Sequence, residues 1–275
     1  MAVTLGGGLL SRYRRFTLYN SPFAAHDRGC AVDLYPEPET APSPVAGEVL
    51  DVRRVRAPPK PYAAEHDYLV LVDTGEHVAR LLHVDPAVET GEHVAVGDPL
   101  GGLVRAGFFA PWVPNHIHLG FRPPEANRYR AAGSLPIEIG VEPRPLGWDG
   151  TGTVVGAGDT WARLDEPEHP APGECFAGLD GGTGVLDGGF PHYGGGGLLG
   201  GDPGRSAVDI VETTVGTVAD RTVTWHDCTV LANGEPVTGI ALFCARDTFG
   251  IKLVGEAIEL GVGDRVGVTV ERSEP

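Results

Sequence analysis

The sequence predicts an all-β protein with two domains, and three observations lead to this prediction. The 275 residues include 41 glycines and 24 prolines, about twice the usual share, and these interrupt almost every window of helical periodicity. Short β-branched runs, such as residues 68–73 and 266–270, are bounded by Gly or Asp and are typical of strands. The dense strand pattern stops near residue 145 and resumes at residue 151. We therefore expect a first domain over residues 1–143 and a second, acidic, Gly-rich β domain over residues 146–275.

In the first domain, a turn over residues 41–50 is expected to lead into a strand, further strands are expected over residues 68–73 and around His116 and His118, and the strand pattern ends over residues 135–142. The sequence Thr-Gly-Glu-His-Val-Ala occurs twice, over residues 74–79 and 90–95. Each copy places a Gly where a hairpin turn favours a positive φ, so both copies are interpreted as hairpin turns. Neither has the helical His-Glu-x-x-His setting of a zinc peptidase helix.

In the second domain, a strand is expected from Thr151, and a strand-and-turn rhythm continues over residues 208–270. Between them, residues 178–204 are exceptionally rich in glycine and include four consecutive glycines at 194–197. We expect this segment to form a long surface loop.

Charge and composition exclude several classes of protein. The net charge is −16: residues 1–145 hold 14 basic against 17 acidic residues, and the remainder holds 7 against 20. Such acidity disfavours nucleic acid as a partner. No stretch is long and apolar enough to span a membrane as a helix. The acid-rich composition, with Lys60 and Lys252 as the two lysines, is similar to that of salt-loving organisms, although a GC-rich genome would also favour Arg over Lys.

Cellular location and redox state follow from two further features. The N-terminal sequence has no secretory signal pattern, so we expect a cytoplasmic protein. The four cysteines have no Cys-x-x-Cys spacing and are expected to be reduced and buried rather than paired or bound to zinc.

The candidate functional residues are a carboxylate, Asp33, and histidines in three segments. His26 precedes Asp33, His83 ends the run Val78-Ala-Arg-Leu-Leu-His83, and Asn115-His-Ile-His118 supplies His116 and His118. Residues two apart in a strand share a face, so the last two imidazoles should point the same way. Two imidazoles near a carboxylate can form a zinc site with an open coordination position.

The order of these segments resembles the lysostaphin-type zinc metallopeptidases, whose domain is a duplicated hybrid motif β-fold. Asp33 is followed by Pro44-Val-Ala-Gly-Glu-Val49, then the His83 segment, then Val88-Glu-Thr-Gly-Glu-His-Val-Ala-Val-Gly-Asp-Pro-Leu-Gly101, and finally His116-Ile-His118. The resemblance covers residues 21–122. It implies zinc-dependent hydrolysis of a peptide or peptide-like bond of the cell-wall (peptidoglycan) type. It also implies that Asp33 and His118 are zinc ligands, and that His83 and His116 activate water or stabilise the oxyanion.

One departure from the family pattern concerns the first zinc ligand. The family has a His four residues before the Asp, where this chain has Gly29, and the nearest histidine is His26, seven residues before Asp33. In a regular strand this odd spacing places His26 on the opposite face, unless a bulge or turn at Arg28-Gly29 restores its direction. A polar Tyr that often precedes the family's catalytic His by two residues is Leu81 here.

Two interpretations therefore stay open. In the first, His26, Asp33 and His118 bind zinc and the protein is a hydrolase. In the second, the domain is a degenerate, non-catalytic binding or regulatory module on the same scaffold. A lipoyl-like carrier domain is a further alternative, but Lys60 lies in Pro-Pro-Lys-Pro rather than in the tight hairpin tip that carries an attachment lysine. A sugar-phosphotransfer scaffold is another, and it would need His83 to face a second histidine such as His116 or His118.

Overall fold

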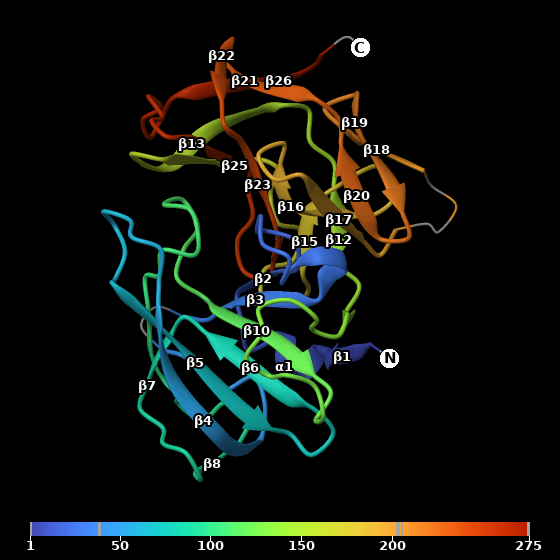
Figure 1. The fold of residues 1–275 in the computed structure, drawn as a ribbon. Helices are drawn as coiled ribbons and strands as arrows, with labels where there is room; N and C mark the ends of the chain where they lie inside the picture. Colours follow the sequence, from blue (N-terminus) through green and yellow to red (C-terminus); the bar gives the residue numbers. More distant parts are fainter. Residues whose placement is uncertain (1, 38–39, 202–203, 205, 274–275) are drawn as a thin grey trace. The chain divides into compact units, whose positions relative to one another are not determined.

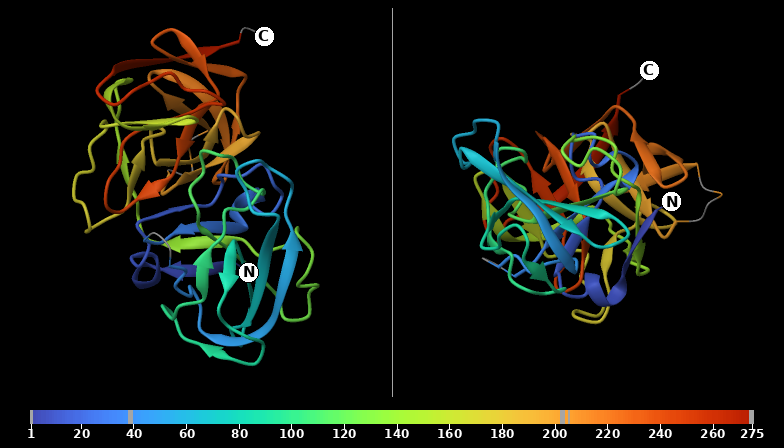
Figure 2. Two further views of the ribbon diagram at one scale, coloured as in Figure 1. Left: turned by 90° about the vertical axis from the view of Figure 1, so that its left-hand side faces the viewer. Right: turned by 60° about the horizontal axis from the view of Figure 1, so that its bottom comes forward.

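A computed structural model describes residues 2–37, 40–201, 204 and 206–273, and it confirms the all-β prediction and the two-domain organisation (Figure 1). The first compact unit comprises Met1–Phe16 and Phe23–Gly140, and the second comprises Thr17–Pro22 and Val141–Pro275. A short segment from the N-terminal part of the sequence thus belongs to the second unit. Strands and turns dominate both units in the two further views of Figure 2.

The first unit is made mainly of short strands. Its elements are β1 (Val3–Gly6), α1 (Gly7–Leu10), the 3₁₀ turn η1 (Asp27–Gly29), β3 (Ala31–Tyr35), β4 (Gly47–Arg56), β5 (His66–Asp73), β6 (Val78–Leu82), β7 (Val84–Pro86), β8 (His93–Val94), β9 (Gly101–Leu103), β10 (Ile117–Arg122) and β11 (Ile137–Gly140). In the sequence, β2 (Arg15–Thr17) lies where the first unit gives way to Thr17–Pro22.

The main sheet of the first unit is antiparallel, with the strand order β3-β10-β6-β5-β4-β8 (Figure 1). On β5, Leu69 and Leu71 pack with Val78, while the alternate residues Val70 and Val72 are also completely buried. Because neighbouring residues of a strand face opposite sides, both faces of this strand are buried. Such a strand has a continuous apolar run in its sequence, as residues 69–72 do.

The two copies of the Thr-Gly-Glu-His repeat both form turns, but only the first closes a hairpin. Gly75 has a φ of 89° in the turn between β5 and β6, which pair with each other. Gly91 has a φ of 92°, yet the strands on either side of it, β7 and β8, pair with β9 and β4. The second hairpin prediction was therefore wrong. The N–H of Gly91 instead donates to the carbonyl of Val49, which ties the turn to β4.

The second unit is also built of strands. They are β12 (Arg144–Leu146), β13 (Thr151–Gly158), β14 (Trp161–Leu164), β15 (Ala177–Leu179), β16 (Val185–Phe190), β17 (Gly195–Leu199), β18 (Ala207–Ile210), β19 (Thr213–Ala219), β20 (Thr222–Trp225), β21 (Cys228–Ala232), β22 (Glu235–Val237), β23 (Gly239–Leu242), β24 (Cys244–Ala245), β25 (Lys252–Val254) and β26 (Arg265–Arg272). The large sheet has the order β18-β19-β20-β17-β16-β23-β25-β14-β13-β26-β21-β22. Its buried core includes Leu164, Leu186, Phe190 and Ile240.

The Gly-rich segment over residues 178–204 is not the surface loop that the sequence predicts, although residues 202–203 lie outside the described part. It forms the antiparallel pair β16 and β17 in the large sheet, and most of its residues there are buried. Glycine is needed because aromatic rings press against the backbone. A Cβ at Gly196 would lie 2.3 Å from a ring carbon of Trp225, and one at Gly197 would lie 2.4 Å from the ring of Tyr19.

The remaining general predictions concern cysteines and membrane spans. All four cysteines have free thiols; Cys228 and Cys244 are buried, while Cys30 and Cys175 are half-buried. Across the described residues, no helix has the length and apolarity to cross a membrane.

The close approach of Trp225 to Gly196 yields a stability prediction. A Gly196→Ala substitution forces the Trp225 ring and the adjoining strand to shift, and we expect it to lower the free energy of unfolding by about 1–3 kcal/mol. Urea unfolding followed by circular dichroism measures this change. Gly194→Ala is the matched control, because no atom lies within 4 Å of its Cβ position, and it should change stability by less than about 0.5 kcal/mol. Equal effects of the two substitutions would contradict this explanation.

Candidate metal centre

Sheet register brings the candidate residues of three strands together. Asp33 on β3 lies directly opposite His118 on β10, and His118 lies opposite Leu82 on β6, the residue before His83. Directly opposed residues of antiparallel strands have Cβ atoms about 4.5–5.5 Å apart, which is within reach of an imidazole and a carboxylate. The site is therefore built on the three adjacent strands β3, β10 and β6.

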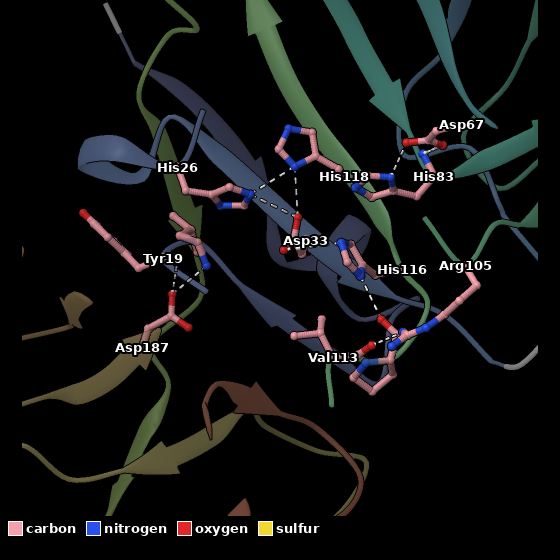
Figure 3. Close-up of polar contacts among 12 residues, drawn as sticks. Tyr19, His26, Asp33, Asp67, His83, Arg105, Val113, His116, His118 and Asp187 are labelled. Atoms are coloured by element: carbon pink, nitrogen blue, oxygen red, sulfur yellow. Dashed lines mark hydrogen bonds and ion pairs between the residues drawn. The ribbon is translucent and has the colours of Figure 1, made fainter. Parts of the chain in front are cut away.

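Asp33 is the centre of the cluster (Figure 3). Its Oδ1 lies 3.1 Å from Nδ1 of His118 and 3.4 Å from Nε2 of His26. Its Oδ2 lies 3.5 Å from Nε2 of His116, which immediately precedes β10. The His116 and His118 imidazoles therefore contact the same carboxylate. This agrees with the expectation that both side chains lie on one face of the strand.

His26 reaches Asp33 because the chain turns between them. Residues 27–29 form η1, in which Arg28 has a φ of 55° and Gly29 a φ of 64°. The N–H of Gly29 donates to the carbonyl of His26 at 3.0 Å, which closes the turn before β3 begins at Ala31. The odd spacing that puts His26 on the wrong face of a regular strand therefore does not apply. Its Nε2 lies 3.1 Å from Nδ1 of His118.

The three atoms His26 Nε2, Asp33 Oδ1 and His118 Nδ1 form a nearly equilateral triangle with sides of 3.1, 3.1 and 3.4 Å. Ligands of a tetrahedral zinc ion, with bonds of about 2.0–2.1 Å, lie about 3.3 Å from one another. Carboxylate oxygens and unprotonated imidazole nitrogens are acceptors, so three of them at this spacing repel one another unless a proton or cation lies between them. This donor set and its spacing fit a divalent metal ion.

Burial sets the protonation of the cluster. The five residues His26, Asp33, His83, His116 and His118 are all buried, with between 2% and 7% of their surface exposed. Burial alone would raise the pKa of Asp33, but the nearby imidazoles and their hydrogen bonds hold that pKa well below its usual value. Burial lowers the pKa of His116 to about 3 and that of His118 to about 4, although Asp33 opposes both shifts. At neutral pH these imidazoles are neutral, which is the form that binds metals.

His116 and His83 each have one ring nitrogen engaged by an acceptor. Nδ1 of His116 lies 2.8 Å from the carbonyl oxygen of Pro114, and Nδ1 of His83 lies 2.6 Å from Oδ2 of Asp67 (Figure 3). The carbonyl of Pro114 only accepts, so Nδ1 of His116 donates to it and Nε2 of the neutral ring carries a lone pair. The same arrangement holds at His83 if Oδ2 of Asp67 accepts from its Nδ1.

The loop between β9 and β10, which contains Phe109, packs against these two imidazoles. The ring centroid of Phe109 lies 4.6 Å from that of His116 and 5.0 Å from that of His83. The Arg105 guanidinium holds the loop by donating to the carbonyls of Ala110, Pro111 and Val113. This arrangement restricts the rotation of both imidazoles.

Sequence reasoning did not identify Asp67, which is completely buried and contacts His83. One signal could have identified it: Asp67 shares a strand face with Leu69 and Leu71, and a carboxylate on an apolar face requires a partner. Its partner lies 16 residues further along the chain, so local spacing does not reveal the pair. The five site residues that the sequence does predict all lie in one cluster.

Comparison with known families gives two matches that together span most of the chain. The model of the N-terminal domain of a domain of unknown function (DUF8155) matches residues 4–139, and the model of its C-terminal domain matches residues 144–271. No curated protein and no solved structure matches the chain.

The protonation of the cluster predicts acid sensitivity of the metal-free protein. In the folded state the pKa values of His116 and His118 are about 3 and about 4, below the value of about 6.5 in an unfolded chain. Between the folded and the unfolded pKa values, only the unfolded chain binds protons at these two histidines. The free energy of unfolding is therefore undiminished above about pH 6.5 and decreases as the pH falls toward 4. Calorimetry of chelator-treated protein from pH 7.5 to 4.5 should show this fall in Tm. A shallower fall is expected for the variant His116→Asn/His118→Asn, and an unchanged slope would contradict the assignment.

Proposed function

The chain belongs to the DUF8155 family, and we propose that it is a zinc-dependent hydrolase that cleaves a peptide or peptide-like bond. One observation carries the proposal: Nε2 of His26, Oδ1 of Asp33 and Nδ1 of His118 converge at 3.1–3.4 Å in a buried site. Two further imidazoles, His83 and His116, adjoin them.

The ligand set favours zinc. Two imidazoles and one carboxylate are typical ligands of catalytic zinc sites, which use three protein ligands and leave a fourth position for water or substrate. No thiol belongs to the group, since the candidate ligands of the described residues are His26, Asp33 and His118. A bound zinc ion would lower the pKa of a water molecule and polarise the scissile carbonyl.

His83 and His116 supply the proton chemistry in this proposal. Each donates its Nδ1–H to a fixed acceptor, and each keeps Nε2 for a proton of the attacking water or of the leaving amine. Their ring centroids lie 4.9 Å apart, so one substrate group can contact both imidazoles. A histidine cluster that only stabilised the fold would not need two further imidazoles next to a set of three metal-ligating atoms.

The resemblance to lysostaphin-type peptidases supports the same reaction and suggests cell-wall peptides as substrates. The all-β first unit, with the antiparallel order β3-β10-β6-β5-β4-β8, is the class of fold that this reaction would use, and the duplicated hybrid motif stays a prediction. We hold the reaction class to be hydrolysis of an amide bond, in which the C–N bond breaks and one water is added.

Metal analysis tests the proposal. Protein purified without added zinc should contain about one zinc ion per chain, as a single three-ligand site requires. His26→Ala, Asp33→Ala and His118→Ala should each lose it, since two protein ligands bind zinc weakly. His93→Ala is the matched control, because this histidine is exposed on β8, and its zinc content should be unchanged.

Hydrolysis is tested on the same preparations with short synthetic peptides and peptidoglycan fragments, with products identified by mass. The zinc-loaded protein should produce fragment pairs that contain one added water. His83→Ala and His116→Ala should retain zinc and lose about 10²–10⁴-fold in rate. A protein that binds no metal at micromolar free zinc would refute the hydrolase and favour a binding or regulatory module.

A further inference from the structure

Asp67 is a buried carboxylate that the proposed ligand set does not use. It is 0% exposed and lies at the start of β5. Both of its oxygens are engaged: Oδ1 accepts the N–H of Tyr68 at 2.8 Å and that of His83 at 3.0 Å, and Oδ2 lies 2.6 Å from Nδ1 of His83. A buried carboxylate without partners is costly, so these contacts account for its position.

The backbone of His83 is unusual. His83 lies between β6 and β7 with a φ of 69°, a left-handed conformation that non-glycine residues rarely adopt. It is held from both sides, since its N–H donates to Asp67 and its carbonyl accepts the N–H of Val104 at 2.8 Å. Such strained backbone persists where the surroundings fix it and is common at functional sites.

We propose that Asp67 is a positioning residue that holds His83 in the Nδ1–H tautomer and so presents Nε2 for proton transfer in the site. This inference rests on the proposed hydrolase function. The contact is the arrangement by which a carboxylate orients a catalytic imidazole and stabilises its protonated form during the reaction. The neighbouring His116 is held differently, because its Nδ1 donates to the carbonyl of Pro114 while its Nε2 lies 3.5 Å from Oδ2 of Asp33. Asp67 therefore fixes the ring of His83 alone.

The variant Asp67→Asn separates the tautomer from the fold. The amide oxygen can replace Oδ1 and accept both backbone N–H groups, whereas the amide nitrogen replaces Oδ2 and donates to Nδ1 of His83. His83 must then carry its proton on Nε2, where it cannot accept another. Asp85→Asn is the matched control, because Asp85 is an exposed aspartate of β7 in the same unit.

The test combines NMR of ¹⁵N-histidine-labelled protein with kinetics. The His83 signals, assigned by their loss in His83→Gln, should report the Nδ1–H tautomer in the wild type and in Asp85→Asn, and the Nε2–H tautomer in Asp67→Asn. The kcat of zinc-loaded Asp67→Asn should fall by about 10²–10⁴-fold, with KM and zinc content unchanged. An Nε2–H tautomer in the wild type, or an unchanged tautomer in Asp67→Asn, would overturn the proposal.

The two readouts distinguish failure of this inference from failure of the proposed function. If the wild type hydrolyses peptides and Asp67→Asn does so equally well, Asp67 has no positioning role, although the hydrolase proposal stands. If the wild type binds zinc without hydrolysing any peptide, the role in proton transfer falls together with the proposed function. If Asp67→Asn does not fold, the wild-type tautomer alone decides whether Asp67 orients His83 as stated.

Discussion

The buried carboxylate of Asp33 imposes the main physical constraint on the first unit. It is nearly inaccessible to water, and the imidazoles of His26, His116 and His118 surround it at 3.1–3.5 Å. An ionised carboxylate is costly to bury unless a cation or several donors compensate its charge. The surrounding imidazoles and their hydrogen bonds hold the pKa of Asp33 well below its usual value, so the buried carboxylate is ionised. A metal ion held by His26, Asp33 and His118 would compensate this charge and use both imidazole lone pairs at once.

The fold meets this constraint with two kinds of element. The sheet register fixes Asp33, His118 and the end of β6 in adjacent rows, and strands of a buried sheet have little freedom to move. The left-handed turn at residues 28–29 brings in the third donor from outside the strand. Groups behind the imidazoles complete the site, since the carbonyl of Pro114 and the carboxylate of Asp67 each fix a tautomer.

Sequence patterns predicted the fold class and most of the cluster, because these depend on local features. Period-2 spacing paired His116 with His118, and the order of the segments added Asp33 and His83. The position of His26 depends on the positive φ values at Arg28 and Gly29. The glycine indicated that a turn could form there, but it did not indicate in which direction the turn would bring His26. The pairing of Asp67 with His83 and the Gly-rich hairpin could not be predicted, because the contacting residues are distant in sequence: His83 for Asp67, and Tyr19 and Trp225 for the hairpin.

Anomalous X-ray diffraction at the zinc edge tests most directly whether two imidazoles and one carboxylate of this chain bind a metal ion. Crystals of protein purified without a chelator should give one strong anomalous peak in the first unit. That peak should lie about 2.0–2.1 Å from Nε2 of His26, Oδ1 of Asp33 and Nδ1 of His118, with a fourth position occupied by solvent. A fully occupied peak at other residues, or no peak at these three atoms at saturating zinc, would contradict the account.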